Sequence, residues 1–219
     1  VTIADDIQVT TAAAQGNTGE WLIDPNDYII AASGGDITGT LLSSQLGSTD
    51  IIIESTGGST SGSGDIKLND EVVWGANKLT LKAENNIYLN ASLKASGSAS
   101  LFLNYGRSSN NGPAPSNFIV NAPVLLGNST TFTTQKGSHS SNLVDDYTII
   151  SGADQLQAIN DNTASKGGNY VLGRRIWAYD KTTSASGSLY NGGLGFDPID
   201  TFTGYIHGLG NKIYGLNIH

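Results

Sequence analysis

The sequence predicts an all-β protein, folded as a parallel β-helix (a solenoid) with about 21–22 residues per coil. Short apolar-polar-apolar triplets recur along the chain, each bounded by Gly, Asn, Asp or Ser, the residues that favour turns. Segment 64–70 resembles segment 85–91, and segment 79–82 resembles segment 101–104, each pair separated by one coil of that length. A recurrent offset between like strands is typical of strands that stack in successive coils.

Runs of apolar and β-branched residues are expected to form the strands, because each run places two side chains on one face and one on the other. They lie at 51–53, 66–68, 79–81, 87–89, 101–103 and 118–120. The last run ends before Asn121, which lies further from Asn90 than one coil length. The polar stretch 106–115 is interpreted as an insertion that accounts for this longer offset.

One stretch in the last third of the chain departs from the β pattern. Its helix formers and its regularly spaced apolar residues predict a short helix near 153–160, which flanks the rod of coils. Ser151 is the expected N-cap, with Asp154 in the position of a capping-box acid. We therefore expect residues 1–150 to form β-helix coils and residues 151–219 to continue the β-helix with this helix and loop insertions.

Two other repeat or all-β folds compete with the β-helix. Leucine-rich repeats have similar periods, but they need a Leu-rich consensus that this sequence lacks. A β-sandwich stays open as an alternative, because the strands are separated by short turns. The regular offset between like segments favours the β-helix.

Composition and charge exclude several classes of protein. The 219 residues include 28 Gly, nearly twice the average usage of about 7%. The formal net charge of −8 and the small number of arginines argue against binding to a nucleic-acid backbone. No apolar run approaches the roughly 18–20 residues that a membrane span needs. Cysteine is absent, so no disulfide framework is possible.

Ordered motifs along most of the chain resemble a known family. Trp21–Pro25 (WLIDP) resembles the opening of filamentous-haemagglutinin-like exoproteins of two-partner secretion systems, of the high-molecular-weight adhesin type. Segment 208–218 (GLGNKIYGLNI) resembles the glycine-leucine repeat called the GLUG motif. Further matching segments lie in family order at 39–42, 50–53, 64–66, 79–83, 86–91, 153–159, 170–173, 195–199 and 202–204.

The resemblance implies a right-handed parallel β-helix within a long, secreted bacterial surface protein. Such a protein is exported through an outer-membrane transporter partner, and this chain would be a segment of its passenger rod. We therefore expect a non-enzymatic adhesin segment at the bacterial cell surface that binds host-cell or matrix glycans or proteins. The alternatives are a haem-acquisition exoprotein, the stalk of a contact-dependent toxin and a β-helical carbohydrate-active enzyme.

Groups that could support catalysis or metal binding are sparse in the sequence. The closest acidic pairs are Asp145–Asp146 and Asp197/Asp200, and both are interpreted as turn residues rather than as a glycosidase pair. His139, His207 and His219 are isolated from one another in the sequence, without the spacing of metal ligands. We expect no enzyme activity, metal or cofactor.

Candidate binding residues cluster in the last third of the chain. The densest aromatic and basic group consists of Arg174, Arg175, Trp177, Tyr179 and Tyr190, with Phe196 nearby. Exposed aromatic side chains stack on sugars or anchor protein partners. The alternative interpretation is that this group covers the junction of the helix and the rod. The polar loop 106–115, which contains Arg107, is the second candidate.

Asparagines suggest two further roles. Asn128 and Asn90 lie in Asn-x-Ser/Thr sequons and are glycosylation candidates. Asn69, Asn90 and Asn121 occupy equivalent positions in successive repeats. We expect their side-chain amides to form a structural ladder, because stacked Asn side chains hydrogen-bond from strand to strand.

Overall fold

The computed structural model describes residues 2–4, 6–11, 13, 19–55, 62–108, 116–138 and 144–219. The chain divides into two compact units. The first comprises Val1–Pro123 and Ser129–Asp146, and the second comprises Val124–Asn128 and Tyr147–His219. The main division thus falls after residue 146, and the segment Val124–Asn128 joins the second unit.

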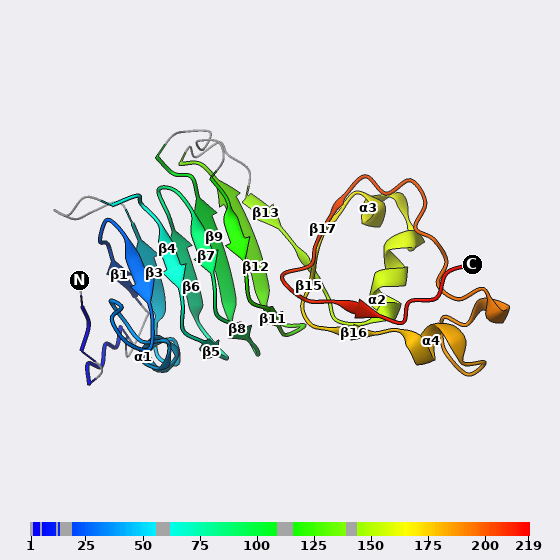
Figure 1. Ribbon diagram of the computed structural model, residues 1–219, viewed down its shortest axis with the longest axis horizontal. Helices are drawn as coiled ribbons and strands as arrows, with labels where there is room; N and C mark the ends of the chain where they lie inside the picture. Colours follow the sequence, from blue (N-terminus) through cyan, green and yellow to red (C-terminus); the bar gives the residue numbers. More distant parts are fainter. Residues whose placement is uncertain are drawn as a thin grey trace. The chain divides into compact units, whose positions relative to one another are not determined.

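The first unit contains a six-stranded sheet in the order β1-β3-β6-β9-β12-β13 (Figure 1). All neighbours in this sheet pair in parallel except β12 and β13, which are antiparallel. The strands are β1 (Glu20–Ile23), β3 (Asp50–Glu54), β6 (Lys78–Lys82), β9 (Ser100–Tyr105), β12 (Thr131–Lys136) and β13 (Val144–Asp146).

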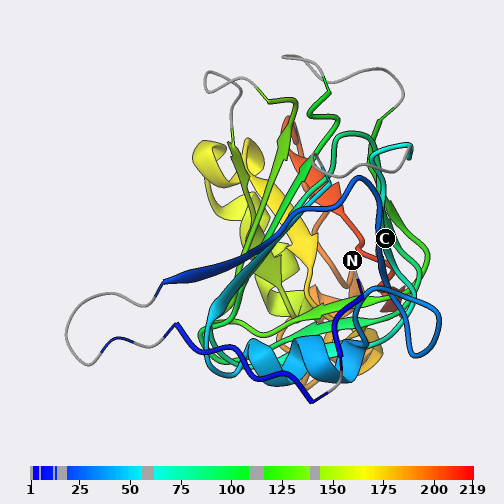
Figure 2. The same ribbon diagram turned by 90° about the vertical axis from the view of Figure 1, so that its left-hand side faces the viewer.

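Further parallel pairings complete the first unit. A second sheet has the order β10-β7-β4-β2, and β5 pairs with β8. The strands are β2 (Tyr28–Ile30), β4 (Ile66–Leu68), β5 (Val72–Trp74), β7 (Ile87–Leu89), β8 (Leu93–Ala95) and β10 (Phe118–Val120). Helix α1 (Gly39–Gln45) packs against β5 and lies below the sheets in the view from the β1 side (Figure 2).

Parallel register aligns like side chains and builds the core of the first unit. Ile53 on β3 lies beside Leu81 on β6, and Leu81 lies beside Leu103 on β9. All three side chains are fully buried. Burying a side chain of this size contributes about 1.5–3 kcal/mol. Each aligned row of aliphatic side chains therefore stabilises the pairing of the strands that it connects.

The second unit combines short strands with short helices. Strands β14 (Thr148–Ile150), β15 (Asn169–Leu172) and β17 (Tyr205–His207) pair in parallel, as do β16 (Ile176–Trp177) and β18 (Ile213–Tyr214). The other elements are β11 (Val124–Leu126), α2 (Ala153–Gln157), η1 (Ala158–Asp161), α3 (Thr163–Lys166), α4 (Tyr179–Thr183) and η2 (Asn191–Gly193). Leu156 and Ile159 from the helices pack with Ile150, Leu172 and Ile176 from the strands in one core.

The prediction of an all-β parallel β-helix, or solenoid, with coils of one regular length is wrong. The described residues form a mixed α/β structure, 15% helical and 35% strand, with several separate and mostly parallel sheets. The predicted spacing holds between β4 and β7, but longer and unequal stretches of chain separate β1 from β3 and β2 from β4. The connections also differ in content, and one of them contains α1. The 21-residue spacing that separates β4 from β7 is therefore not repeated along the whole chain.

Most local predictions are confirmed. The strands expected at 51–53, 66–68, 79–81, 87–89, 101–103 and 118–120 are present, and the helix expected near 153–160 is present as α2 and η1. The expected N-cap is wrong: Gly152 caps α2 without a side-chain hydrogen bond, and the Ser151 backbone N–H donates to Gln155 Oε1 at 2.7 Å. No helix among the described residues is long and apolar enough to cross a membrane.

Replacing Leu81 by Ala tests the aligned core. The truncation removes buried methyl groups and leaves a cavity, so we expect the free energy of unfolding in a urea titration to fall by about 2–5 kcal/mol. Leu22→Ala is the matched control, because Leu22 lies on β1 of the same sheet and is 56% exposed. We expect its effect to stay within about 0.5 kcal/mol. Equal losses for the two variants would contradict the assigned core.

Candidate functional site

The two-stranded sheet β16–β18 displays polar and aromatic side chains on its outer face. Ile176 lies beside Ile213, and Trp177 lies beside Tyr214. Ile176 is buried in the core of the second unit, whereas Trp177 is 65% exposed. Because side chains alternate along a strand, the residues two positions before Trp177 and Tyr214 share their outer face.

Backbone pairing brings those two preceding residues together. The Ile176 N–H donates to the Lys212 carbonyl at 2.9 Å, and the Ala178 N–H donates to the Tyr214 carbonyl at 2.8 Å. Arg175 and Lys212 therefore stand at the same end of this sheet. We call the set Arg175, Trp177, Lys212 and Tyr214 the aromatic–basic platform.

The rings and the guanidinium of the platform are in contact. The Trp177 and Tyr214 rings stack with centroids 4.7 Å apart and an interplanar angle of 23°. The guanidinium carbon of Arg175 lies 5.7 Å from the Trp177 ring centroid and 5.6 Å from that of Tyr214. Cation–π contacts at exposed sites contribute about 0.5–1 kcal/mol, so Arg175 and Tyr214 help to hold Trp177 in one orientation.

Charge is distributed unevenly between the two units. The second unit contains five acidic and five basic side chains, so the formal net charge of −8 belongs entirely to the first unit. The acidic residues of the second unit are Asp154, Asp161, Asp180, Asp197 and Asp200, and the basic ones are Lys166, Arg174, Arg175, Lys181 and Lys212.

Two of the five cations in the second unit are paired with carboxylates. Lys181 lies 3.1 Å from Asp154, and Lys166 forms an ion pair with Asp200. The hydrogen bond from Ser188, followed by Lys181, lowers the pKa of Asp154, and Lys166 lowers the pKa of Asp200. In the part of the chain that the structure describes, Arg174, Arg175 and Lys212 make no ion pair.

The structure brings only some of the predicted aromatic and basic group together. Arg175 and Trp177 belong to the platform, and Arg174 is exposed next to it in the chain. Tyr179 is 63% exposed. It lies against Gly215, the residue that follows β18: a Cβ atom added to Gly215 would stand 2.7 Å from the Tyr179 Cβ. Gly215 also has a φ of +65°, which favours glycine. Tyr190 is half-buried as the N-cap of η2.

Phe196 and Arg107 have structural roles in the described contacts. Phe196 is 4% exposed and belongs to the core of the second unit. The Arg107 side chain, in the first unit, is 18% exposed and forms ion pairs with Glu54 and with Glu84, the latter at 3.8 Å. Burial raises the pKa of Glu84, an effect that Arg107 opposes. Residues 109–115 of the predicted binding loop lie outside the described residues.

Tyr214 and Lys212 were missed by the sequence interpretation. They lie far along the chain from Trp177 and Arg175, and only the pairing of β16 with β18 brings them together. The available signal was the alternation in segment 212–214, which matches segment 175–177 in its order of basic, apolar and aromatic residues.

The asparagine side chains of the first unit form the expected ladder. Asn90 Nδ2 donates to Asn69 Oδ1 at 2.8 Å, and Asn121 Nδ2 donates to Asn90 Oδ1 at 2.7 Å. Both polar atoms of the Asn90 side chain are thus engaged, although the residue is exposed. A sugar on Asn90 Nδ2 would disturb this ladder, whereas Asn128 is exposed in the second unit. Glycosylation of either residue stays a prediction.

The acidic pairs that the sequence singled out lie on the surface. Asp145 and Asp146 are exposed on β13, which pairs with β12. Asp197 accepts a hydrogen bond from Asn160 Nδ2 at 3.1 Å, and Asp200 is the partner of Lys166. These contacts are those of surface and turn residues.

The histidines differ in their surroundings. His207 is half-buried, its Nδ1 accepts a hydrogen bond from the Leu209 N–H at 2.9 Å, and burial lowers its pKa. His219 is exposed, and His139 lies outside the described residues. Among the residues that the structure describes, no three His, Cys, Asp or Glu side chains are grouped as metal ligands.

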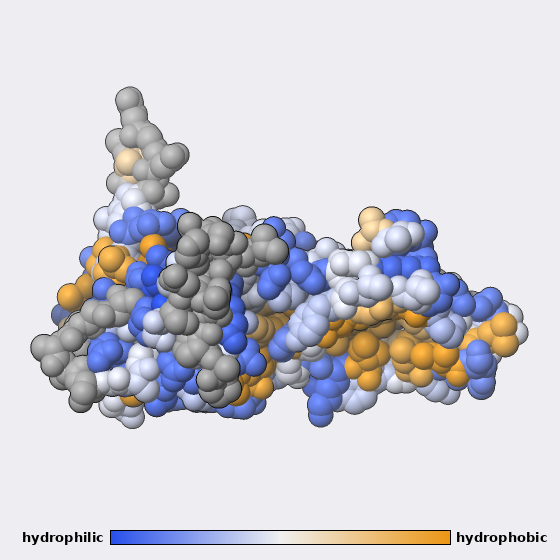
Figure 3. Space-filling view, turned by 90° about the horizontal axis from the view of Figure 1, so that it is seen from above, coloured by the Kyte–Doolittle hydropathy of each residue, from blue (hydrophilic) through white to orange (hydrophobic). Residues whose placement is uncertain are grey.

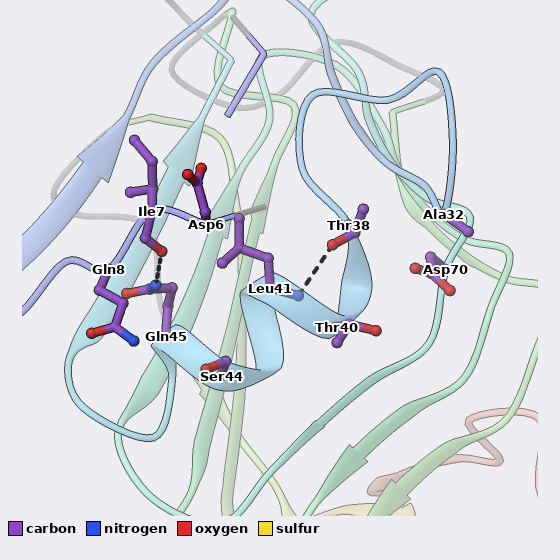
Figure 4. Close-up of a pocket in the computed structure, with 10 residues that line it drawn as sticks. All are labelled: Asp6, Ile7, Gln8, Ala32, Thr38, Thr40, Leu41, Ser44, Gln45 and Asp70. Carbon is purple, nitrogen blue, oxygen red and sulfur yellow. Dashed lines mark hydrogen bonds between the residues drawn. The ribbon is translucent and has the colours of Figure 1, made fainter. Parts of the chain in front are cut away.

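A cavity of about 490 Å³ lies beside α1 in the first unit (Figure 4). Several of its polar groups already serve the fold. Gln45 Nε2 donates to the Ile7 carbonyl at 2.7 Å, Thr38 Oγ1 accepts from the Leu41 N–H, and Asp70 Oδ2 accepts from the backbone N–H at the start of α1. These bonds hold α1 in place, so Thr38, Gln45 and Asp70 have structural roles.

A second cavity and an apolar surface occur in the second unit. The cavity, of about 520 Å³, is lined mainly by polar residues, including Gln157, which exchanges two hydrogen bonds with Asp197. Hydrophobic residues also form a band on the surface of this unit (Figure 3). The exposed apolar residues of the second unit include Leu194, Ile206 and Ile218. Neither feature combines charge with an ordered aromatic surface, so the platform is the stronger candidate site.

Replacing Asn90 by Ala tests the ladder. The change removes two side-chain hydrogen bonds, so we expect the free energy of unfolding to fall by about 1 kcal/mol. Asn128→Ala is the control, because Asn128 is also an exposed sequon residue but lies outside the ladder. A urea titration compares the two variants. An unchanged stability of the Asn90 variant would show that the ladder adds nothing to the fold.

The environment of His207 predicts a dependence of stability on pH. Its folded-state pKa is lowered, so the unfolded chain binds the proton more tightly. The stabilisation is complete above the unfolded pKa of about 6.5, and it decreases as the pH falls toward the folded pKa. We expect His207→Gln to reduce the slope of unfolding free energy against pH between about 7.5 and 5.5. His219→Gln is the control, and an unchanged slope for His207→Gln would refute this role.

No family model matches the chain, and no curated protein or solved structure matches it either. The candidate site therefore rests on its own side chains. These are a stacked Trp–Tyr pair in contact with an arginine, together with a lysine. Neither cation has a carboxylate partner in the described structure.

Proposed function

We propose that this chain is a non-enzymatic binding segment of a secreted bacterial exoprotein, an adhesin that attaches to host-cell or matrix glycans. The observation that carries the proposal is the aromatic–basic platform, in which Trp177 is 65% exposed yet held by Tyr214 and Arg175. The proposal does not include the β-helix that the family resemblance implied, because the structure contradicts it.

The platform has the composition of a recognition surface. Trp, Tyr and Arg are the residues most enriched among those that dominate binding energies. An exposed aromatic ring offers apolar area to the C–H face of a sugar, while nearby polar groups bind hydroxyls. Because the Trp177 ring is already stacked and contacted by Arg175, ligand binding immobilises it at a low entropic cost.

Export and location are also part of the proposal. The motifs at Trp21–Pro25 and at 208–218 support secretion through an outer-membrane transporter and display at the cell surface. The absence of cysteine agrees with folding outside the cell without disulfides.

Replacing Trp177 by Ala tests glycan binding. We expect the labelled wild-type chain to bind at least one glycan on an array. The Trp177 variant should bind that glycan about tenfold or more weakly, as expected for a residue at the centre of a binding surface.

The control for this experiment is Tyr205→Ala. Tyr205 is an aromatic residue on β17 of the same unit, is 51% exposed and lies outside the platform. We expect its binding to equal that of the wild-type chain. The proposed function would be refuted if the wild-type chain bound no glycan on the array. It would also be refuted if the Trp177 and Tyr205 variants lost the same amount of glycan affinity.

A further inference from the structure

Unpaired positive charge in the second unit is concentrated at the aromatic–basic platform. The two other cations of this unit, Lys166 and Lys181, are neutralised by carboxylates. Three cations make no ion pair in the described structure. Arg175 and Lys212 belong to the platform and directly precede β16 and β18, and Arg174 is the neighbour of Arg175 in the chain. This concentration is local, because the second unit as a whole is formally neutral.

The contact of Arg175 with the rings leaves its hydrogen-bond donors available. A cation–π contact engages the charge of the guanidinium and uses none of its five N–H donors. The described structure shows no hydrogen bond or ion pair from the Arg175 side chain, whose recorded contacts are those with Trp177 and Tyr214. Arg175 is thus oriented by the rings and able to form a bidentate pair with a carboxylate.

The stacked rings add to the preference for an anion. Trp177 and Tyr214 face each other at 4.7 Å, so each ring covers one face of the other. A ligand therefore meets the outer faces and the edges of the stack, and aromatic edges carry partial positive charge. A sugar that carries a carboxylate complements both parts of the surface: its ring lies against the stack, and its carboxylate lies toward Arg175 and Lys212.

We infer that the platform binds an acidic glycan, one whose sugar rings carry carboxylates, in preference to its neutral counterpart. This inference rests on the proposed function and adds the substrate class. A neutral glycan would leave Arg175 and Lys212 without a partner in the complex. A nucleic acid fits less well, because affinity for a phosphate backbone requires many cations, whereas this unit has no net positive charge.

The test compares oligogalacturonate with its methyl ester, two ligands that differ only in the free carboxylate. We expect the full chain to bind the acid at least tenfold more tightly than the ester in a calorimetric titration at low salt. Arg175→Gln and Lys212→Gln should each weaken binding of the acid about fivefold or more, and each should weaken binding of the ester by a smaller factor.

Lys94→Gln is the matched control, because Lys94 is a half-buried cation in the first unit, paired with Glu71 at 2.7 Å. We expect it to bind the acid as the wild-type chain does. Far-UV circular dichroism and the melting temperature establish that each variant is folded. Lys212→Gln provides a second test of the charge if Arg175→Gln alters the ring stack.

Three outcomes overturn the inference. Equal binding of acid and ester would refute the role of charge but leave the proposed glycan binding intact. Equally tight binding of dextran sulfate would show that charge density alone explains the affinity for the acid. If neither the acid nor the ester binds, and no glycan on the array binds, the proposed function itself is refuted.

Discussion

In-register parallel pairing is the constraint on which the structure depends. In a parallel pair, each residue lies beside one partner on the next strand and points to the same face. In the first unit this places Ile53, Leu81 and Leu103 in one buried row. The same geometry stacks the amides of Asn90 and Asn121 on the surface. One backbone arrangement thus produces both the apolar core and the polar ladder.

The candidate site is a consequence of the same constraint. Strands β16 and β18 are very short, yet their register sets Trp177 against Tyr214 and directs the two isoleucines to the opposite face. The inward pair anchors the sheet in the core, because Ile176 belongs to the buried cluster and Ile213 packs against it. In the outward pair, Trp177 stays exposed to solvent. Because Ile176 and Ile213 are anchored in the core, they fix the positions of Trp177 and Tyr214, which follow them in the two strands. Two short strands can thus present an ordered pair of aromatic rings.

Sequence patterns predicted the local elements and the contacts between segments that share the repeat spacing, and they failed where that spacing does not hold. The triplets at 66–68 and 87–89 specify strands through their own alternation, and their spacing is realised as the pairing of β4 with β7. The fold class was wrong because such spacing depends on the connections, and the link from β2 to β4 contains α1 and β3. Arg175 and Trp177 were found because they are close together in the sequence. Tyr214 was missed because only the closure of β16 onto β18 brings it to Trp177.

The central claim is that an acidic glycan binds where Arg175 meets the Trp177–Tyr214 stack. A crystal structure of the chain with bound oligogalacturonate tests this most directly. The account predicts a sugar ring against the outer face of the stack and its carboxylate within hydrogen-bond distance of the Arg175 guanidinium or Lys212 Nζ. A sugar bound elsewhere, for instance in the cavity beside α1, with the platform unoccupied, would contradict the account.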